Sequence, residues 1–296
     1  MSLRVGFLGL GIMGSRMAAN VAAGGFPLTV WTHSDGKAER WSAQHAGTTV
    51  AATPAEVAAA SDLVVSMVVD GDQVESVLCG SSGVCDGAHE GLLCVDMSTI
   101  APTDTRRIAA RLAAHGVAMI DAPVTGSAPR AQAGTLTIMV GGEAEHFERA
   151  RSVLEAMGEL VVHVGALGQG EMLKLINNSL GAANAAAVAE ALLVAQATGV
   201  DLDALVQVTQ SGSGASAQLA MKSTPMREHD YTTLFKTDHL LKDVRLCLEE
   251  AQAAGVPFPA AAHARDLLAA TTGRGHGQDD YSAIVEAAEG LAGRRL

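Results

Sequence analysis

Aromatic side chains are scarce in this chain of 296 residues, at 3% of the sequence, although hydrophobic residues reach 48%. Such a hydrophobic share excludes an intrinsically disordered chain and suffices for a sizeable core. Because few rings are available to fill that core, small residues must let backbones pack closely. The composition therefore favours a helix-rich α/β architecture, as one large domain or two smaller ones.

Basic residues are also in short supply: 20 lysines and arginines stand against 32 aspartates and glutamates, which gives a formal net charge of −12. A chain of this charge repels phosphate backbones, and it contains no long basic run, so we expect no nucleic-acid partner. Small anionic substrates remain possible, because a site can be locally positive inside an acidic protein.

Cysteine motifs and long hydrophobic runs are missing too. Cys79, Cys85, Cys94 and Cys247 form no CxxC pair, and there is no HExxH motif, so we expect reduced thiols, a cytoplasmic protein and no metal site. Glycines interrupt the apolar N-terminus, which predicts a strand and turn rather than a signal peptide. The other apolar runs are too short for us to expect a membrane-spanning helix.

The first half of the chain alternates apolar runs with alanine-rich segments. Several of the runs are continuous rather than alternating, as in parallel strands that are buried on both faces. The expected strands are Arg4–Leu8, Leu28–Trp31, Leu63–Val69, Leu92–Asp96, Val117–Asp121, Leu136–Val140 and Leu160–Val164. The expected helices between them are Ser15–Ala23, Pro54–Ala60, Pro102–His115 and Glu143–Met157. This alternation predicts a doubly wound sheet with right-handed crossovers.

After Gly165 no convincing strand follows. A long alanine-rich helix without proline is expected over Gly170–Thr198, and later helices over Leu202–Gln210, Leu240–Ala254, Ala260–Ala269 and Ser282–Ala292. We therefore predict an α/β domain at residues 1–165 and an all-α domain at residues 166–296, joined by the long helix.

A glycine-rich motif follows the first expected strand and opens a helix: Gly9-Leu10-Gly11-Ile12-Met13-Gly14. In a GxGxxG motif the first glycine permits a tight turn, the second lets the backbone approach a pyrophosphate, and the third lets helix and strand pack closely. The N–H groups at the helix N-terminus then face the anion. A lone motif is weak, but its place in a βαβ context predicts a dinucleotide-binding Rossmann domain.

The end of the second expected strand carries no acid for an adenine ribose, which NAD enzymes usually have about 20 residues after the glycines. Thr32, His33 and Ser34 stand there instead, followed by Asp35 and Lys37. Thr32, His33, Ser34 and Lys37 could surround a 2′-phosphate, so NADP is favoured over NAD. The alternative is an ordinary polar turn that discriminates poorly between the two.

Further motifs follow one another along the chain: Gly6–Asn20, Asp96–Thr99 with Ala101-Pro102, Asp121–Ser127, Gly134–Leu136, Met139–Gly142, Gly170–Asn178, Phe235 with Lys242-Asp243, and the late loop at residues 275–283. In this order they resemble the β-hydroxyacid dehydrogenases, a family that includes 3-hydroxyisobutyrate dehydrogenases and tartronate semialdehyde and glyoxylate/succinic semialdehyde reductases. The resemblance implies an NAD(P)-dependent hydride transfer between a nicotinamide and a small β-hydroxyacid or semialdehyde. It also implies a homodimer or homotetramer.

Lys174 is the one basic residue in the long apolar helix, and Asn178 lies four residues later on the same face. Partial burial would lower the pKa of such a lysine and suit it to acid–base work, whereas the alternative is a lysine that extends into solvent. The resemblance places the catalytic lysine of the family at Lys174. It implies that Asn178 orients the reacting oxygen and that Asn177, Phe235 and Asp243 lie near the substrate.

The loop Thr125-Gly126-Ser127 offers hydroxyls and backbone N–H groups that can hold a substrate carboxylate. The family usually has Ser-Gly-Gly here, so Thr125 adds a methyl group and Ser127 adds bulk, and both leave the substrate open. Arg130 follows, either as a cationic partner for an acidic substrate or as a solvated surface residue.

For the cofactor, the resemblance implies contacts from Val68 and Val69, from Ser98 or Thr99, and from Lys242. Many members have Leu-Pro in place of Val68-Val69, and arginine in place of His33, so these positions bear on the choice between NADP and NAD.

Three other interpretations remain open. A decarboxylating 6-phosphogluconate-type enzyme would be longer and have histidine where Asn177 stands, and an imine-reductase-like enzyme would generally lack Lys174. A catalytically silent dinucleotide-binding module is disfavoured by the retained set Lys174, Asn178, Thr125 and Lys242.

Overall fold

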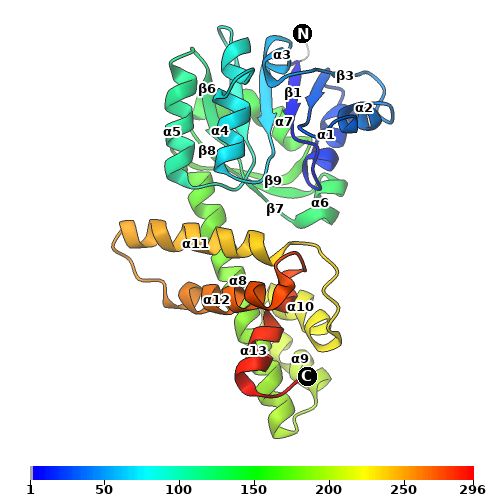
Figure 1. The fold of residues 1–296 in the computed structure, drawn as a ribbon, viewed down its shortest axis with the longest axis vertical. Helices are drawn as coiled ribbons and strands as arrows, with labels where there is room; N and C mark the ends of the chain where they lie inside the picture. The colour runs from blue at the N-terminus through cyan, green and yellow to red at the C-terminus, as the bar shows by residue number, and fades with distance from the viewer. Residues whose placement is uncertain (1–2) are drawn as a thin grey trace. The chain divides into compact units, whose positions relative to one another are not determined.

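The computed structural model describes residues 3–296 and divides into two compact units, Met1–Lys174 and Leu175–Leu296. We call them the N-terminal unit and the C-terminal unit, and each is described by itself. The first is an α/β Rossmann-like structure and the second is helical, so the expected fold class is confirmed (Figure 1). The division falls inside helix α8 (Gln169–Thr198), after Lys174, rather than at Gly165 where the sequence pattern changes.

One sheet runs through the N-terminal unit. Its strands are β1 (Val5–Leu8), β2 (Leu28–Trp31), β3 (Thr48–Val50), β4 (Leu63–Ser66), β5 (Leu93–Asp96), β6 (Ala118–Asp121), β7 (Val124–Thr125), β8 (Leu136–Gly141) and β9 (Gly158–Gly165). The order is β3-β2-β1-β4-β5-β6-β8-β7, with β9 paired to β8. The strands from β1 to β6 are all parallel, in the order of a dinucleotide-binding doubly wound fold. Strand β8 runs antiparallel to β6 and β7 but parallel to β9.

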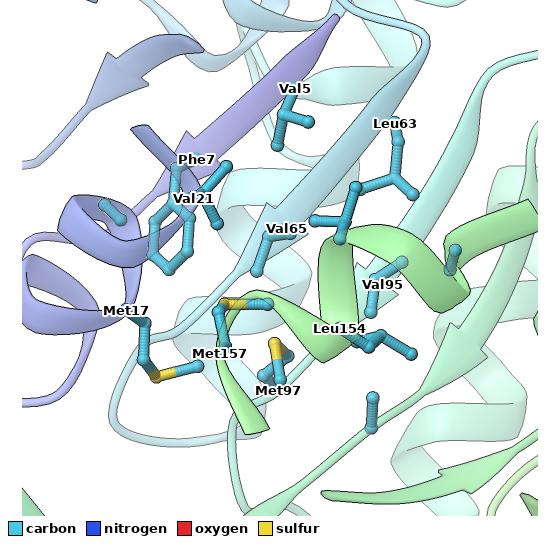
Figure 2. Close-up of a cluster of buried hydrophobic side chains, with 14 of the residues drawn as sticks. Val5, Phe7, Met17, Val21, Leu63, Val65, Val95, Met97, Leu154 and Met157 are labelled. Atoms are coloured by element: carbon cyan, nitrogen blue, oxygen red, sulfur yellow. The ribbon is translucent and has the colours of Figure 1, made fainter. Parts of the chain in front are cut away.

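Both faces of this sheet are buried at the central strands β1, β4 and β5, which explains their continuous apolar runs, whereas half of the residues of β9 are exposed. Along β1 and β4, Phe7 and Val65 join one core cluster, whereas Leu8 and Val64 join a second cluster on the opposite face. Figure 2 shows the first cluster, which joins Met17 and Val21 of α1 to strand residues such as Phe7 and Val65 and to Met97 and Met157.

Seven helices of the N-terminal unit flank the sheet: α1 (Gly14–Ala23), α2 (Lys37–Ser42), α3 (Pro54–Ala59), α4 (Gly71–Cys79), α5 (Pro102–Ala113), α6 (Ser127–Ala133) and α7 (Ala144–Glu155), with a short 3-10 turn at Val84–Gly87. The sequence predicted α1, α3, α5 and α7 close to these bounds. It did not predict α2, α4 or α6, nor the short strands β3 and β7.

The C-terminal unit contains the larger part of α8, then α9 (Leu202–Ser211), α10 (Ala217–Glu228), α11 (Thr237–Ala253), α12 (Pro259–Thr271) and α13 (Ile284–Ala292), with short turns at Thr272–His276 and Tyr281–Ala283. Its core lies on the face of α8 that carries Ala182, Ala185, Ala186 and Ala189, all of them buried. Because these small side chains recur at helical spacing, neighbouring helices can approach α8 closely.

Helix α8 is also, among residues 3–296, the one helix long and apolar enough to cross a membrane by length and composition. Within its most apolar window, 44% of the residues are buried inside the protein. The apolar composition of α8 is therefore also that of a core helix, because its alanine face is buried in the C-terminal unit. All four cysteines are free thiols.

Candidate active site

The glycine-rich turn after β1 has the geometry that its sequence predicts. Gly9 has φ +100°, and a Cβ there would lie 2.3 Å from the Met67 carbonyl oxygen. A Cβ on Gly14 would lie 2.0 Å from the Gly9 carbonyl oxygen, whereas a Cβ on Gly11 would meet no atom within 4 Å. The outer glycines are thus required by packing, and the middle one leaves open space beside the start of α1. A pyrophosphate fits there, against the helix N-terminus.

The end of β2 lies beside this turn. The Leu10 N–H lies 3.4 Å from the Thr32 hydroxyl, and the His33 ring stands edge-on to Trp31, with 6.4 Å between centroids. His33 and Ser34 are exposed. The Arg40 guanidinium also reaches this segment, because a Cβ on Gly36 would lie 2.9 Å from it. Arg40 was not among the predicted residues.

Predicted cofactor residues follow β4 and β5, where hydroxyls surround a buried carboxylate. The Ser98 hydroxyl donates to Asp96 over 2.7 Å and accepts the Val68 N–H over 3.0 Å. The Ser66 hydroxyl also donates to Asp96, over 2.8 Å. Burial raises the pKa of Asp96 to about 6, although these hydrogen bonds oppose the shift. Ser98 therefore holds two strand ends together from a fully buried position, while Thr99 is half-buried and Val69 is exposed.

The predicted substrate loop departs from ordinary backbone geometry at two neighbouring residues. Gly126 has φ +138° and Ser127 has φ +57°. Left-handed backbone favours glycine, so Ser127 carries backbone strain where the family usually has glycine. Thr125 is half-buried, and Arg130 lies 3.4 Å from Glu159 in an exposed ion pair. That surface pair favours the solvated interpretation of Arg130.

The predicted catalytic side chains on α8 are buried. Lys174 and Asn178 are each 8% exposed and lie on the same face of the helix, whereas Asn177 is exposed. The low exposure of Lys174 disfavours a lysine that merely extends into solvent.

Within the C-terminal unit, Asn178 is oriented by a carboxylate of α11. Its Nδ2 donates to Asp243 over 2.7 Å, and the other Asp243 oxygen lies 3.2 Å from the Lys242 amine. Asp243 is only 2% exposed. Asp243 therefore acts on Asn178 and Lys242 directly, and a carboxylate in this place fixes which end of the Asn178 amide faces it.

Two models of protein families match this chain. Residues 4–165 match the NAD binding domain of 6-phosphogluconate dehydrogenase, and residues 168–288 match the NAD-binding domain of NADP-dependent 3-hydroxyisobutyrate dehydrogenase. The chain belongs to the β-hydroxyacid dehydrogenase family.

Individual members are similar over nearly the full length. The 3-sulfolactaldehyde reductase of Escherichia coli K12 is 37% identical, over 98% of this chain and 97% of its own. The 2-hydroxy-3-oxopropionate reductase of the same organism is 36% identical, over 99% and 100%. The solved 3-hydroxyisobutyrate dehydrogenase of Mycobacterium tuberculosis, with L-serine, has a TM-score of 0.89 and 32% identity over 97% of this chain and 99% of that one. This dehydrogenase is thus an NAD(P)-dependent hydroxyacid/semialdehyde oxidoreductase, of the class that acts on CH–OH groups.

A buried ion pair of this dehydrogenase lies close to the predicted residue Phe235 and joins Asp280 of the late loop to a lysine of α10. The Phe235 backbone N–H donates to Asp280 over 3.1 Å, and Asp280 forms a buried 2.6 Å ion pair with Lys222. The Phe235 ring lies near Tyr281, 6.1 Å between centroids. Lys222 falls in α10, a helix that the sequence did not predict, so no sequence signal pointed to this pair.

One cluster of the C-terminal unit brings potential metal ligands within 4.8 Å of one another: His229, Glu286 and Glu289. Internal donors already engage both carboxylates. Glu289 accepts from His229 over 2.9 Å and from the Leu296 N–H over 2.8 Å, and Glu286 accepts from the Tyr231 hydroxyl over 2.8 Å. These contacts make the cluster a hydrogen-bond network, to which the backbone of Leu296 also contributes.

Proposed function

We propose that this dehydrogenase interconverts a small β-hydroxyacid and its semialdehyde, of the tartronate semialdehyde or 3-hydroxyisobutyrate type, with NADP as cofactor and Lys174 as general acid and base. The observation that carries the proposal is the burial of Lys174 on the same helix face as Asn178, each 8% exposed. Nearly buried polar side chains on one face favour a reaction centre over a solvated surface.

The proposed roles follow from the donors that each side chain offers. When bound, the nicotinamide supplies or accepts the hydride. The Lys174 amine gives a proton to the substrate oxygen on reduction and takes it back on oxidation. One N–H of Asn178 is engaged by Asp243, so its second N–H remains to orient that oxygen. Thr125 and the backbone of Gly126 and Ser127 hold the substrate carboxylate.

Preference for NADP is supported by the segment after β2. His33 and Ser34 are exposed there, Arg40 reaches over Gly36, and no acid stands at the end of the strand. These groups suit a 2′-phosphate better than a 2′-hydroxyl. Ser34→Asp would add a carboxylate that repels the phosphate, so we expect it to raise the Kd of NADPH at least about tenfold while the Kd of NADH changes less.

We further propose a cytoplasmic homodimer or homotetramer. Val194, Val208 and Leu291 of the C-terminal unit are 63%, 71% and 79% exposed, which supports self-association, and the four free thiols support a reducing compartment. Light scattering on a sizing column measures the assembly, and a monomer at micromolar concentration would contradict it.

The reaction is tested by following NADPH and NADH absorbance with a panel of small semialdehydes. With the substrate found, Lys174→Ala should lower kcat by about 10²- to 10⁴-fold, because the proton donor is gone, while the Kd of NADPH measured by fluorescence stays nearly constant. Leu173→Ala is the matched control, since Leu173 is the exposed neighbour on the same helix. Full turnover by Lys174→Ala would reject the role of Lys174, and cofactor binding without turnover on any substrate would favour a silent module.

A further inference from the structure

Asp121 is a buried carboxylate for which the proposed reaction has no use. It is the last residue of β6, is 0% exposed, and pairs in register with Gly141 of β8. Four residues later the chain reaches Thr125, the start of the loop that is proposed to hold the substrate. Asp121 therefore lies where a strand of the sheet becomes the substrate loop.

Both oxygens of Asp121 accept backbone N–H groups at the start of α8, one from the residue before the helix and one from its first turn. Oδ1 accepts the Gly168 N–H over 2.7 Å, and Oδ2 accepts the Glu171 N–H over 2.8 Å. The first N–H groups of a helix have no partner within the helix, and a negative charge at its N-terminus is favourable. Burial raises the pKa of Asp121, while these backbone hydrogen bonds oppose the shift. A residue distant in sequence thus caps the helix that carries Lys174.

The backbone around this carboxylate is packed as closely as glycine allows. A Cβ on Gly170 would lie 2.4 Å from the Met139 carbonyl oxygen and 2.8 Å from Asp121 Oδ2. A Cβ on Gly141 would lie 2.5 Å from Asp121 Oδ1. Neither position can take a side chain unless backbone moves, so α8 begins in direct contact with the end of the sheet.

A second link holds the same helical turn from another strand end. The side chain of Glu171, which is 0% exposed, accepts the Ile100 N–H over 3.2 Å. Ile100 directly follows Ser98 and Thr99, where cofactor contacts are predicted. Lys174 lies three residues after Glu171, which is one helical turn further along the same side. The turn that precedes Lys174 is therefore fixed by both the β6 end and the segment after β5.

We propose that Asp121 is a positioning residue: its carboxylate fixes the first turn of α8 and so sets the place of Lys174 relative to the Thr125–Ser127 loop. The inference rests on the function proposed above, because it assigns Asp121 to the reaction in which Lys174 moves the proton. Displacement of a reacting group by about 1 Å can cost about 100-fold in rate. A cap on the helical turn that precedes Lys174 can therefore control turnover.

The test is Asp121→Asn, which preserves the shape but offers an N–H₂ group to one of the two backbone donors. We expect kcat to fall about 10- to 100-fold while the Kd of NADPH changes less than about threefold, because the glycine turn is untouched. Val57→Ala is the matched control: Val57 is a fully buried side chain of α3 in the same unit, and its truncation lowers stability without touching α8. It should lower the melting temperature but keep kcat.

Hydrogen exchange separates this proposal from the proposed function. In Asp121→Asn, the amides of Gly168 and Glu171 should exchange at least about tenfold faster than in the parent protein, and in Val57→Ala they should not. This readout needs no substrate, so it decides whether Asp121 holds the turn even if no semialdehyde is turned over. Unchanged exchange, or an unchanged kcat in an active enzyme, would overturn the assignment.

A second variant tests the same proposal if Asp121→Asn does not fold. Gly170→Ala keeps the carboxylate but forces the α8 backbone away from Met139, so it should lower kcat with little effect on the Kd of NADPH. Gly181→Ala is its control on the same helix, where the nearest neighbour of a new Cβ would be the flexible Gln218 side chain at 3.4 Å. Equal kcat values for Gly170→Ala and the parent protein would also overturn the proposal.

Discussion

Buried carboxylates in the two units have different partners. In the N-terminal unit, Asp96 and Asp121 accept from hydroxyls and backbone N–H groups, and burial raises the pKa of both. In the C-terminal unit, burial also acts to raise the pKa of Asp280, but the hydrogen bond and charge of Lys222, together with hydrogen bonds from the Ser282 and Phe235 backbones, lower the pKa overall. All three side chains are at most 2% exposed. A cationic partner thus distinguishes Asp280, whose pKa is lowered, from Asp96 and Asp121, whose hydrogen-bond donors are uncharged.

A buried carboxylate with a raised pKa and one with a lowered pKa change the stability of the fold in opposite directions as pH rises. The pKa of Asp96 is about 6 in the folded chain against 3.8 as its ordinary value, so its effect on folding becomes less favourable as pH rises through this interval. The pKa of Asp280 is below 3.8, so its favourable effect is present above that value and is lost as pH falls through the folded pKa.

Removal of the cation from the C-terminal pair should have the largest effect. Lys222→Met leaves Asp280 buried without its countercharge, so we expect the free energy of unfolding of this unit to fall by about 3–5 kcal/mol. Urea titrations can follow each unit separately, because Trp31 and Trp41 lie in the N-terminal unit and Tyr231 and Tyr281 in the other. Tyrosine absorbance should shift while tryptophan fluorescence does not.

The double variant Lys222→Met with Asp280→Asn is the control for this prediction. It removes both charges and keeps an oxygen for the Phe235 N–H, so it should recover much of the lost stability. If the double variant is as unstable as the single one, the loss comes from packing rather than from an unpaired charge.

Two isosteric variants should change the free energy of unfolding with pH in opposite directions, by an intermediate amount. Asp96→Asn removes the group whose folded pKa is raised, so its stability relative to the parent should rise by about 2–3 kcal/mol from about pH 4 to about pH 7. Asp280→Asn should do the reverse and lose stability relative to the parent as pH rises from strongly acid values to the ordinary carboxyl pKa of 3.8. Urea titrations measure the two slopes, below pH 3.8 for Asp280→Asn and from about pH 4 to about pH 7 for Asp96→Asn, and slopes of the same sign would contradict the comparison.

A smaller effect is expected from removing one hydroxyl beside Asp96. Ser98→Ala deletes the donor to Asp96 and the acceptor of the Val68 N–H, so the N-terminal unit should lose about 1–2 kcal/mol of stability. The pKa of Asp96 should rise further, because a hydrogen bond that lowers it is lost. Tryptophan fluorescence in urea at two pH values tests both statements, and Ser42→Ala, a hydroxyl in the same unit away from Asp96, is the control.

The sequence predicted those parts of the fold that depend on residues close together in the chain, namely the glycine turn, most strands and the long helix. The glycines at 9, 11 and 14 could be assigned separate roles, because a tight turn, an approaching anion and a helix–strand contact each need glycine for a different reason. Short apolar runs predicted seven strands, and an alanine-rich stretch without proline predicted α8. The antiparallel course of β8 was not predicted, since a run of six apolar and small residues carries no information on strand direction.

Helix α10 and the buried charges show why the remainder was missed. Pro225 lies inside α10 and argues against a helix locally, yet Ser216 caps its N-terminus and Leu219 and Met226 are buried by tertiary packing. Asp121 and Glu171 were visible only as parts of motifs, because their partners are 50 and 71 residues away in sequence. Lys174 and Asn178 could be chosen from one helix, whereas the Asp243 partner of Asn178 comes from α11, 65 residues later.

The start of α8 also decides where this protein can be cut. A fragment that stops at Gly165 would keep every strand yet remove Gly168 and Glu171, so Asp121 would face solvent or stay charged inside the sheet without its donors. A fragment that runs through Lys174 retains both donors and coincides with the observed division of the chain. Truncation of the nucleotide-binding half for calorimetry or crystallisation should therefore include the first turns of the following helix.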